Sequence, residues 1–362
     1  MNLYIHDGEI LTTHGNLEKT WEALLADKKP AEQSLNGHTQ TYPLASITEL
    51  GQDYGSSIRL YSLLEMIYAT LPELPPETRL ICATTKAAID EIAKTPSPQN
   101  GQIWQITDDI AKKLNLTEDG SCISAACASG TIAIIQGGLK ILAGECNNVL
   151  IIGFDLMSEF VINGFTSLKA LSPSHCRPFD KNRDGLTLGE GAGWLLLSNS
   201  ADTYSHTGKT FMLTNWGISC DATHITAPCR MASGLIRTLQ SMTDNGSFAP
   251  GGINAHGTGT SYNDAMELLA FESVFRQPPP LCSIKGSIGH CLGAAGVIES
   301  VISLKSLEKG FLPPTIGLIE PDDKAVNVLS GKQIIPLNNP SIINCNSGFG
   351  GINAGVLFIE QS

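Results

Sequence analysis

Short apolar runs alternate with longer segments of helical pattern along this chain, and this alternation restricts its possible folds more than any other feature. The strand-like runs are rich in branched residues and lie at residues 149–155, 193–197, 252–255, 342–346 and 354–359. The helical segments lie at about residues 127–144, 230–243, 262–275 and 293–308. Strands that alternate with helices predict an α/β fold whose sheets are buried between helices.

The length of the chain indicates more than one structural unit. It has 362 residues, which exceeds the size at which a single hydrophobic core usually stops growing. The polar segment at residues 199–208 is the natural division. We therefore predict an N-terminal half at residues 1–205 and a C-terminal half at residues 206–362. Hydrophobic residues make up 42% and charged residues 16%, a balance that argues against disorder.

The net charge excludes one class of partner. At −12, the protein would repel the phosphates of a nucleic acid. An acidic protein partner would need a local basic patch, and no long run of Lys and Arg predicts one.

The start of the chain and its cysteines predict a cytoplasmic protein. Residues 1–10 have neither the basic nor the apolar region of a signal peptide. The longest apolar stretches are about half as long as a membrane span requires. The ten cysteines are scattered singly, without a CxxC pair or a ligand-like Cys/His spacing. We therefore expect free thiols in a reducing cytoplasm, with neither disulfides nor a zinc site.

A candidate nucleophile, Cys127, lies within residues 124–130, Ser-Ala-Ala-Cys-Ala-Ser-Gly. A strand-like run precedes it and an apolar helical segment follows, so it stands at the start of a helix. There the unpaired N–H groups and the helix dipole favour a thiolate over a thiol. Small neighbouring residues leave room for a substrate to reach the sulfur. A buried structural cysteine fits the same pattern, so these residues alone leave both roles open.

A first candidate histidine, His256, ends a predicted strand and is followed by Gly-Thr-Gly-Thr. The glycines allow the backbone to approach a ligand closely, and Thr258 and Thr260 can form hydrogen bonds to its polar groups. A hydrogen-bonded histidine that closes a turn is the structural alternative.

A second candidate histidine, His290, begins a helix of small residues that also carries Glu299, and Lys285 precedes it. A buried network of the lysine, a histidine and the glutamate would set the protonation of the imidazole. A structural ion pair beneath the helix is the alternative.

A glycine-rich turn with one aromatic residue occupies residues 346–353, Asn-Ser-Gly-Phe-Gly-Gly-Ile-Asn. Backbone N–H groups exposed in such a turn can hold an oxyanion. A hairpin turn in which Phe349 packs into the core explains this motif at least as well.

Together these four motifs resemble one family, the β-ketoacyl-[acyl-carrier-protein] synthases with a Cys-His-His triad, which elongate acyl chains in fatty acid and polyketide synthesis. The resemblance also covers residues 8–30, residues 221–228 and residues 176–193, CRPFDKNRDGLTLGEGAG, a highly specific signature. From about residue 120 to residue 362 it is nearly continuous. Several motifs in the order of the family make coincidence a poor explanation.

The resemblance implies the thiolase fold, with two similar βαβαβαββ halves in a five-layer α-β-α-β-α arrangement. It implies that Cys127 is the acylated nucleophile, and that His256 and His290 bind the malonyl thioester carbonyl and promote decarboxylation. The backbone N–H groups of Cys127 and Phe349 would form an oxyanion hole, and the Phe349 ring would gate the acyl pocket. The reaction requires no metal or redox cofactor.

The resemblance also assigns supporting roles and partners. Thr258 and Thr260 would line the phosphopantetheine channel, and Lys285 and Glu299 would form the supporting network. The implied partner is an acyl carrier protein, and the implied assembly is a homodimer or a heterodimer with a second synthase-like subunit.

The chain departs from the family pattern in places. Ala125 replaces a frequent threonine, and Ser287 replaces the usual asparagine. Residues 40–120 match poorly and are fewer than in typical chain-elongating members, which leaves chain length and partner choice open. Residues 80–92 and 165–173 resemble compact synthases of aryl polyene and related pigment pathways.

Three other classes of protein are alternatives to a chain-elongating synthase. A degradative thiolase would need a second catalytic cysteine where Phe349 stands. An initiating ketosynthase would pair the cysteine with one histidine and an asparagine. A non-catalytic chain-length factor would usually lack the nucleophile, whereas Cys127, His256 and His290 are all present.

Residues 101–120 carry an apolar stripe at helical spacing, formed by Trp104, Ile106, Ile110 and Leu114. Such a stripe serves either a subunit interface or, more commonly, the core.

Overall fold

The fold is described from a computed structural model. It describes residues 2–361 apart from residues 31, 34–41, 52, 55–56, 95–101, 202, 204–208, 326–330 and 332. The predicted boundary between residues 205 and 206 therefore lies outside the described residues. No helix in the described part of the chain is long and apolar enough to cross a membrane.

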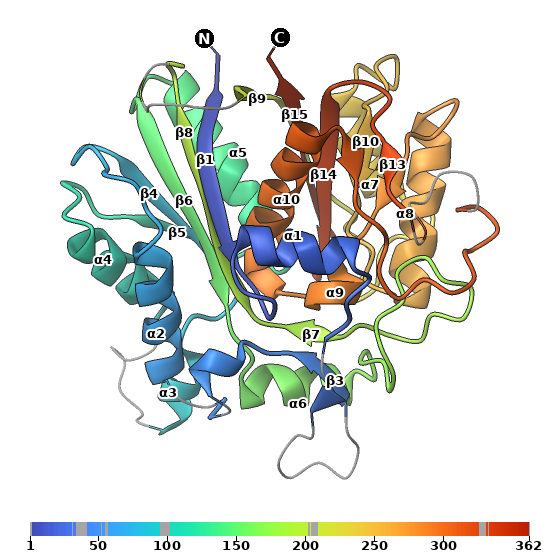
Figure 1. The fold of residues 1–362 in the computed structure, drawn as a ribbon, viewed down its shortest axis with the longest axis horizontal. Coiled ribbons are helices and arrows are strands. Elements are labelled where there is room, and N and C mark those ends of the chain that lie inside the picture. The colour runs from blue at the N-terminus through green and yellow to red at the C-terminus, as the bar shows by residue number, and fades with distance from the viewer. Residues whose placement is uncertain are drawn as a thin grey trace.

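One ten-stranded sheet runs through the molecule and consists of two five-stranded parts (Figure 1). The N-terminal part has the order β5 (Ser121–Ile123), β4 (Arg79–Ala83), β6 (Asn148–Asp155), β8 (Gly191–Ser198) and β1 (Tyr4–Leu11). The C-terminal part has the order β11 (Leu281–Cys282), β10 (Gly252–Asn254), β14 (Ser341–Gly348), β15 (Ile352–Glu360) and β9 (Phe211–Cys220).

The two parts repeat one topology. Numbered within its own half, each has the strand order third, second, fourth, fifth, first. In each, the first two pairings of that order are parallel and the last two are antiparallel. The first strands of the two halves, β1 and β9, pair antiparallel and join the parts into one sheet. This repetition is the one expected for two similar βαβαβαββ halves.

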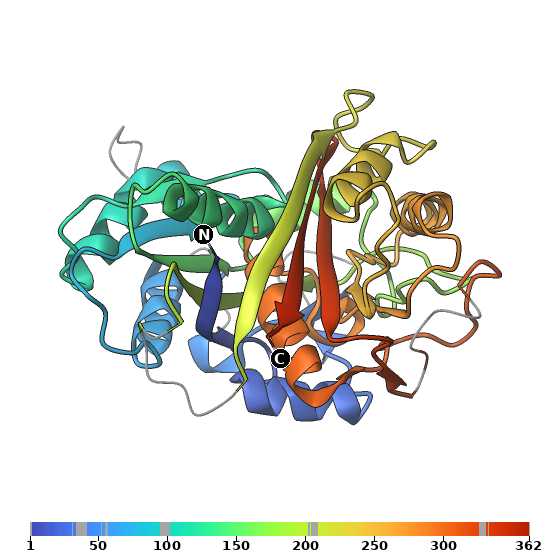
Figure 2. The same cartoon turned by 90° about the horizontal axis from the view of Figure 1, so that it is seen from above.

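Helices cover both faces of each half-sheet and form five layers with them (Figures 1 and 2). The central layer is α5 (Ser129–Leu142) with α10 (Ala295–Lys309), and these two helices contact strands of both halves. On the outer face of the N-terminal half lie α2 (Ser57–Tyr68) and α4 (Ile103–Lys113). On the outer face of the C-terminal half lie α7 (Ser233–Met242) and α8 (Ser261–Val274). The α/β thiolase-type prediction is confirmed.

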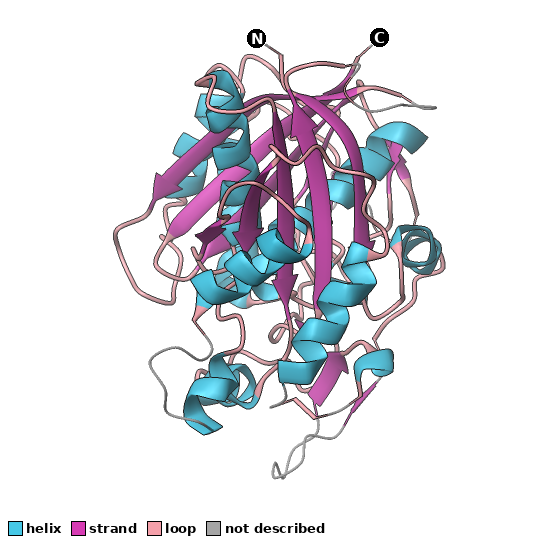
Figure 3. Cartoon of the chain, turned by 90° about the vertical axis from the view of Figure 1, so that its left-hand side faces the viewer, coloured by secondary structure: helices cyan, strands magenta, loops and turns pink. Residues whose placement is uncertain are grey.

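Shorter elements complete the chain, and in Figure 3 helices and loops surround the strands at the centre of the molecule. The short helices are α1 (Leu17–Leu25), α3 (Ile89–Lys94), α6 (Glu159–Ser167) and α9 (Lys285–Ile288). The short strands are β2 (Glu32–Gln33), β3 (Tyr42–Ala45), β7 (Leu188–Gly189), β12 (Phe311–Leu312) and β13 (Ile335–Pro336).

The predicted elements are all present, with ends that differ by a few residues. The five predicted strands correspond to β6, β8, β10, β14 and β15, and the four predicted helices to α5, α7, α8 and α10. The alternation did not single out β9 as a strand, because its side chains include exposed and half-buried polar residues along with apolar ones.

The prediction of an apolar stripe within residues 101–120 is wrong for one of its four residues. Ile106 and Ile110 are buried against α2 and β4, and Leu114 packs beside them. Trp104 is 59% exposed. On a helix, a residue two positions before Ile106 points to nearly the opposite face, so Trp104 does not belong to the stripe. Ile106 and Ile110 therefore belong to the core of the N-terminal half.

The two central helices cross at their N-terminal ends through glycines. A methyl carbon at Gly130 would lie 2.6 Å from the backbone nitrogen of Val297, and one at Gly296 would lie 2.4 Å from the backbone nitrogen of Thr131. No side chain fits between backbones at these distances. This crossing brings the start of α5 beside the start of α10.

We predict that Gly130→Ala destabilises the protein by about 1–3 kcal/mol, the usual cost of overpacking, because backbone must move to admit the methyl group. The control is Gly164→Ala on α6, where the added carbon meets nothing within 4 Å. The control should match wild type or gain up to about 1 kcal/mol from helix propensity. Urea unfolding followed by circular dichroism would measure both. Equal stability of Gly130→Ala and wild type would contradict the close crossing.

Candidate active site

Cys127 lies on a sharp turn between β5 and α5. The preceding residue, Ala126, has a φ of +50°, a left-handed conformation that is uncommon for alanine. Ser129 holds this turn: its hydroxyl accepts a hydrogen bond from the Ala125 N–H at 2.8 Å and donates one to the Ala126 carbonyl at 2.6 Å. The predicted elbow is therefore present, and it directs Cys127 away from the strand.

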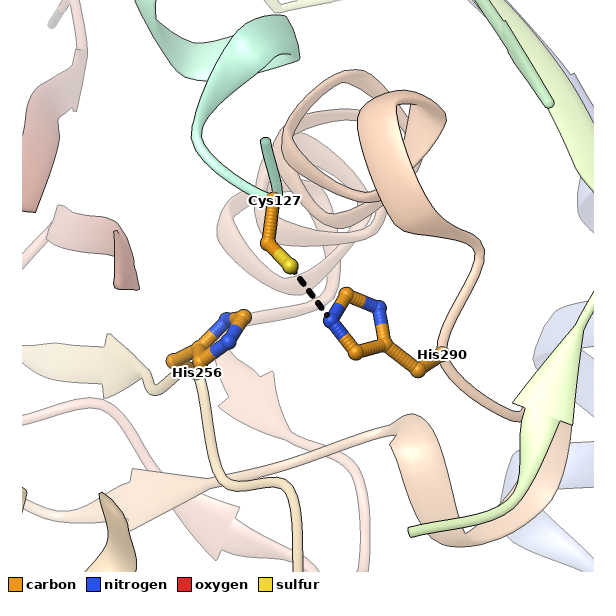
Figure 4. A group of neighbouring side chains, drawn as sticks. All are labelled: Cys127, His256 and His290. Atoms are coloured by element: carbon orange, nitrogen blue, oxygen red, sulfur yellow. Dashed lines mark hydrogen bonds between the residues drawn. The ribbon is translucent and has the colours of Figure 1, made fainter. Parts of the chain in front are cut away.

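Cys127, His256 and His290 converge from three separate segments (Figure 4). His256 follows β10, and His290 follows α9 and precedes α10. The Nε2 atom of His290 lies 3.0 Å from the Cys127 sulfur. The two imidazole rings lie edge to face, with centroids 5.2 Å apart and an angle of 83° between their planes. All three side chains are buried.

Hydrogen bonds at Nδ1 set the tautomer of both rings. The Leu292 backbone N–H lies 3.2 Å from Nδ1 of His290, and Nδ2 of Asn346 lies 3.2 Å from Nδ1 of His256. A neutral imidazole that accepts at Nδ1 carries its proton on Nε2. Both rings therefore present Nε2–H groups.

Burial keeps both rings neutral. Desolvation, and then the positive charge of Lys285, hold the pKa of His256 and of His290 well below the usual value. Each histidine is thus a neutral hydrogen-bond donor at neutral pH.

Burial also raises the pKa of Cys127 to about 12, although the Lys285 charge and the Phe349 backbone N–H oppose this shift. The resting side chain is therefore a thiol, in contrast to the thiolate expected from the helix start. That expectation included the effect of the helix start, which lowers the pKa of a thiol. It left out the loss of solvent around the sulfur, which raises the pKa. The Phe349 N–H and the His290 Nε2–H would stabilise the thiolate once it forms.

The predicted network of Lys285 and Glu299 lies beneath His256. The Lys285 ammonium donates to the Glu299 carboxylate and, at 2.5 Å, to the His256 backbone carbonyl. Burial raises the pKa of Glu299, while the Lys285 charge and an Asn346 hydrogen bond lower it. Both charged groups are buried, so each depends on the other for its compensation.

The glycine-rich turn lies against Cys127, and its role as an oxyanion hole stays a prediction. The Phe349 backbone N–H lowers the pKa of the Cys127 thiol, against the larger effect of burial. A methyl carbon at Gly348 would lie 3.1 Å from the Cys127 backbone nitrogen, so the two backbones are adjacent. The Phe349 ring stacks on Phe165, with centroids 5.7 Å apart.

A cavity of about 400 Å³ opens beside the triad. Cys127 and both histidines line its inner end. The hydroxyl groups of Thr258 and Thr260 lie on its wall, 2.9 Å from one another. Its mostly apolar lining and its few polar groups fit a long flexible substrate.

Two buried acids that the sequence interpretation missed hold the His256 loop. The Glu267 carboxylate accepts from the N–H groups of His256 and Gly257, each at 2.7 Å. The Asp264 carboxylate accepts from the N–H groups of Thr258 at 3.0 Å and Gly259 at 3.1 Å. Burial raises the pKa of Glu267 to about 8. The sequence offered one sign of this role. Asp264 and Glu267 are three residues apart at the start of the predicted helix that follows the loop.

A third missed acid, Asp155, holds the segment that follows His290. Its Oδ2 atom accepts from the Gly293 N–H at 2.8 Å and from the N–H and hydroxyl of Thr85 at 2.9 Å each. Asp155 ends the predicted strand β6, where an acid after an apolar run was the only signal.

The ligand atoms of Cys127, His256 and His290 all lie within 4.8 Å of one another, a separation that also suits a metal ion.

Two family models cover most of the chain. The description "Beta-ketoacyl synthase, N-terminal domain" matches residues 16–203, and "Beta-ketoacyl synthase, C-terminal domain" matches residues 210–318. The chain belongs to the β-ketoacyl synthase family. The resemblance inferred from the motifs is thereby confirmed, whereas the aryl polyene subgroup stays a prediction.

Two relatives that carry the name of this activity resemble part of the chain. The chloroplastic 3-oxoacyl-[acyl-carrier-protein] synthase II of Arabidopsis thaliana is 33% identical over 65% of this chain and 46% of its own length. The 3-oxoacyl-[acyl-carrier-protein] synthase 2 of Staphylococcus aureus is 30% identical over 70% of this chain and 65% of its own length. The matches thus span less than two thirds of these relatives.

Solved synthase structures share the whole fold. A chain from the complex of a ketosynthase with its chain length factor from Xenorhabdus doucetiae has a TM-score of 0.79 and 25% identity, over 99% of this chain and 98% of its own. A β-ketoacyl synthase from Burkholderia phymatum has a TM-score of 0.83 and 22% identity, over the full length of both chains.

We predict that alkylation of Cys127 by iodoacetamide accelerates about tenfold per pH unit from about pH 7.5 to about pH 9.5, without a plateau. Below a pKa of about 12 the reactive thiolate is a small fraction that grows with pH. Cys229 is the internal control, because hydrogen bonds to Ser233 and Met231 lower its pKa. Its alkylation should level off earlier. Peptide mass spectrometry measures both rates, and a Cys127 plateau below about pH 9 would contradict the buried thiol.

Proposed function

We propose that this protein is a 3-oxoacyl-[acyl-carrier-protein] synthase. It would condense an acyl chain, held as a thioester on Cys127, with malonyl-acyl carrier protein to give β-ketoacyl-acyl carrier protein. The observation that carries this proposal is the convergence of two neutral Nε2–H donors, on His256 and His290, beside a buried thiol. Such a pair can stabilise a negative oxygen without first giving up a proton.

The first step is acyl transfer. The Cys127 sulfur attacks the thioester carbonyl of the acyl carrier, and the carrier thiol leaves with the proton of the cysteine. The backbone N–H groups of Cys127 and Phe349 would hold the tetrahedral oxyanion. The position of Cys127 on a sharp turn and in the lining of the cavity supports this step.

The second step is decarboxylation. The malonyl thioester carbonyl would receive hydrogen bonds from Nε2–H of His256 and of His290. Carbon dioxide leaves, and its bonding electrons form an enolate whose oxygen these two donors stabilise. Neutral donors suit this task, because an imidazolium would protonate the enolate.

The third step is formation of the carbon–carbon bond. The enolate carbon attacks the acyl carbonyl on Cys127, and the tetrahedral intermediate expels the cysteine thiolate. The β-ketoacyl product remains on the carrier, and the thiolate regains a proton from solvent. The three steps move protons, an acyl group and carbon dioxide and transfer no electrons to an acceptor, so we propose that no metal or redox cofactor takes part.

The partners follow from the substrates and the assembly of related structures. An acyl carrier protein would present its phosphopantetheine arm along Thr258 and Thr260. A ketosynthase from Xenorhabdus doucetiae and the ishigamide ketosynthase were each solved with a chain length factor. We therefore propose a homodimer, or a heterodimer with a synthase-like subunit, as the assembly. The pathway we propose is fatty acid, polyketide or polyene synthesis.

We propose a cytoplasmic location, because all ten cysteines are free, which suits a reducing cytoplasm.

We predict that Cys127→Ala abolishes both acylation and condensation, because the covalent thioester cannot form, while some malonyl decarboxylation survives on the intact histidines. Intact-mass analysis after incubation with a panel of acyl carrier substrates checks the acylation. Full acylation of the alanine variant would exclude Cys127 as the nucleophile.

We predict that His256→Ala and His290→Ala each slow condensation by about 10²-fold or more, the scale for losing one oxyanion donor. Acylation of Cys127 should persist at least in part, which provides the control within each variant. Single-turnover formation of the β-ketoacyl product measures the effect. Near-normal condensation in either variant would remove that histidine from the mechanism.

We predict a particle of twice the chain mass in light scattering at micromolar concentration. Strand β5 ends the ten-stranded sheet, and an uncovered sheet edge is a site for pairing with another chain. A fully active monomer would contradict the dimer. Activity that arises only after a second synthase-like subunit is added would indicate an obligate heterodimer, the alternative to an independently active enzyme.

A further inference from the structure

The side chains of Cys127, His256 and His290 offer the donor atoms of a zinc site. The hydrogen bonds around the two imidazoles differ from those of a zinc site. A sulfur and two imidazoles lie within 4.8 Å of one another, all buried and all open to one cavity. Histidine that binds a metal through Nε2 must keep its proton on Nδ1, and it normally donates that proton to a carboxylate or carbonyl. The group facing Nδ1 therefore decides whether such a triad binds metal.

For His290, the facing group can only donate. It is the backbone N–H of Leu292, which lies 3.2 Å from Nδ1. For His256, the facing group is the amide of Asn346, at 3.2 Å. An amide can present either its NH₂ group or its oxygen, so the orientation of Asn346 determines the tautomer of His256.

Two neighbours orient the Asn346 amide, which lies on β14 and is fully buried. Its Nδ2 donates to Oε2 of Glu299 at 2.7 Å, and its Oδ1 accepts from the Thr131 hydroxyl at 2.5 Å. The other Glu299 oxygen is bound by the Lys285 ammonium. If the amide were turned over, its oxygen would face the Glu299 carboxylate. Two buried acceptors, Oε2 of Glu299 and Nδ1 of His256, would then lose the N–H groups that now donate to them.

A chain of contacts thus leads from a buried ion pair to one ring nitrogen. The Lys285 charge favours the carboxylate form of Glu299, the carboxylate orients Asn346, and Asn346 occupies the lone pair of His256 Nδ1. We propose that Asn346 is a positioning residue, which holds His256 as an Nε2–H donor. Together with the Leu292 N–H at His290, it denies the triad a metal ion. The catalytic value of the His256 donor rests on the proposed function, whereas the tautomer and the exclusion of metal do not.

The unmodified protein offers the first test, by solid-state nitrogen NMR on histidine-labelled protein, with the His256 signals identified by their loss in His256→Asn. We expect a protonated Nε2 and an unprotonated Nδ1. Cobalt(II), whose bonds to thiolate sulfur absorb strongly, should produce no such band at one equivalent. A protonated Nδ1 on His256, or stoichiometric cobalt bound through Cys127, would overturn the proposal.

An exchange variant reverses the hydrogen bond while keeping charge and size. In Asn346→Asp combined with Glu299→Gln, the carboxylate moves to position 346, where it accepts from Nδ1–H of His256. The Nε2 lone pair then faces the cavity. We expect a reversed His256 tautomer, while the Leu292 N–H keeps His290 an Nε2–H donor. Cys127 and His256 can then bind one ion together, so cobalt affinity should be at least about tenfold above wild type, with one proton released as the Cys127 thiol is bound. Condensation should fall about 10²-fold while Cys127 acylation continues.

The matched control is Asn344→Ser on the same strand, where Asn344 contacts Gly296 and Ser300 of α10. Its substitution should leave the His256 tautomer and the cobalt response as in wild type. An exchange variant that folds and keeps Nε2–H on His256 would contradict the role of Asn346. Because NMR and cobalt binding require no substrate, the predicted tautomer in a protein without condensing activity would refute the proposed function alone.

Discussion

The backbone contact between α5 and α10 is the constraint on which the active site depends. At Gly130 and Gly296 the helices are too close for any side chain. Cys127 precedes one helix and His290 precedes the other, and 163 residues separate them in the chain. The two helices are equivalent elements of two repeated halves. Their crossing therefore brings residues of two similar halves into one asymmetric site, with Cys127 from one half and both imidazoles from the other.

The charged groups next to the triad, Lys285 and Glu299, lie beneath His256 and are separate from the three side chains of the triad. They are ionic partners, while the three side chains of the triad that line the cavity are a thiol and two neutral rings. In a buried site this separation has a physical advantage. Fixed N–H dipoles stabilise a developing oxyanion strongly where solvent is excluded, and a bare cation beside the thiol would itself need compensation.

The N-terminal region that resembles the family least is nevertheless anchored to its most specific signature. Arg59 of α2 forms a buried ion pair with Glu190 of that signature, at 2.7 Å. The Glu190 carboxylate also accepts from the N–H groups of Ile47 and Met157, each at 3.0 Å. One carboxylate thus joins the outer layer, the segment before α2 and the end of β6.

The sequence by itself determined the alternation of strands and helices, the family, and the side chains Cys127, His256 and His290, because local patterns of apolar residues and small-residue motifs carry that information. It also indicated that Lys285 and Glu299 belong together. Only the tertiary structure decided the protonation of the cysteine, since the pKa of a thiol depends on how much solvent the whole fold removes. The direction of the Asn346 amide was likewise invisible, because Thr131, Glu299 and His256 reach it from three distant segments. Hydrogen bonds of this kind arise from packing between layers, and no local sequence pattern encodes them.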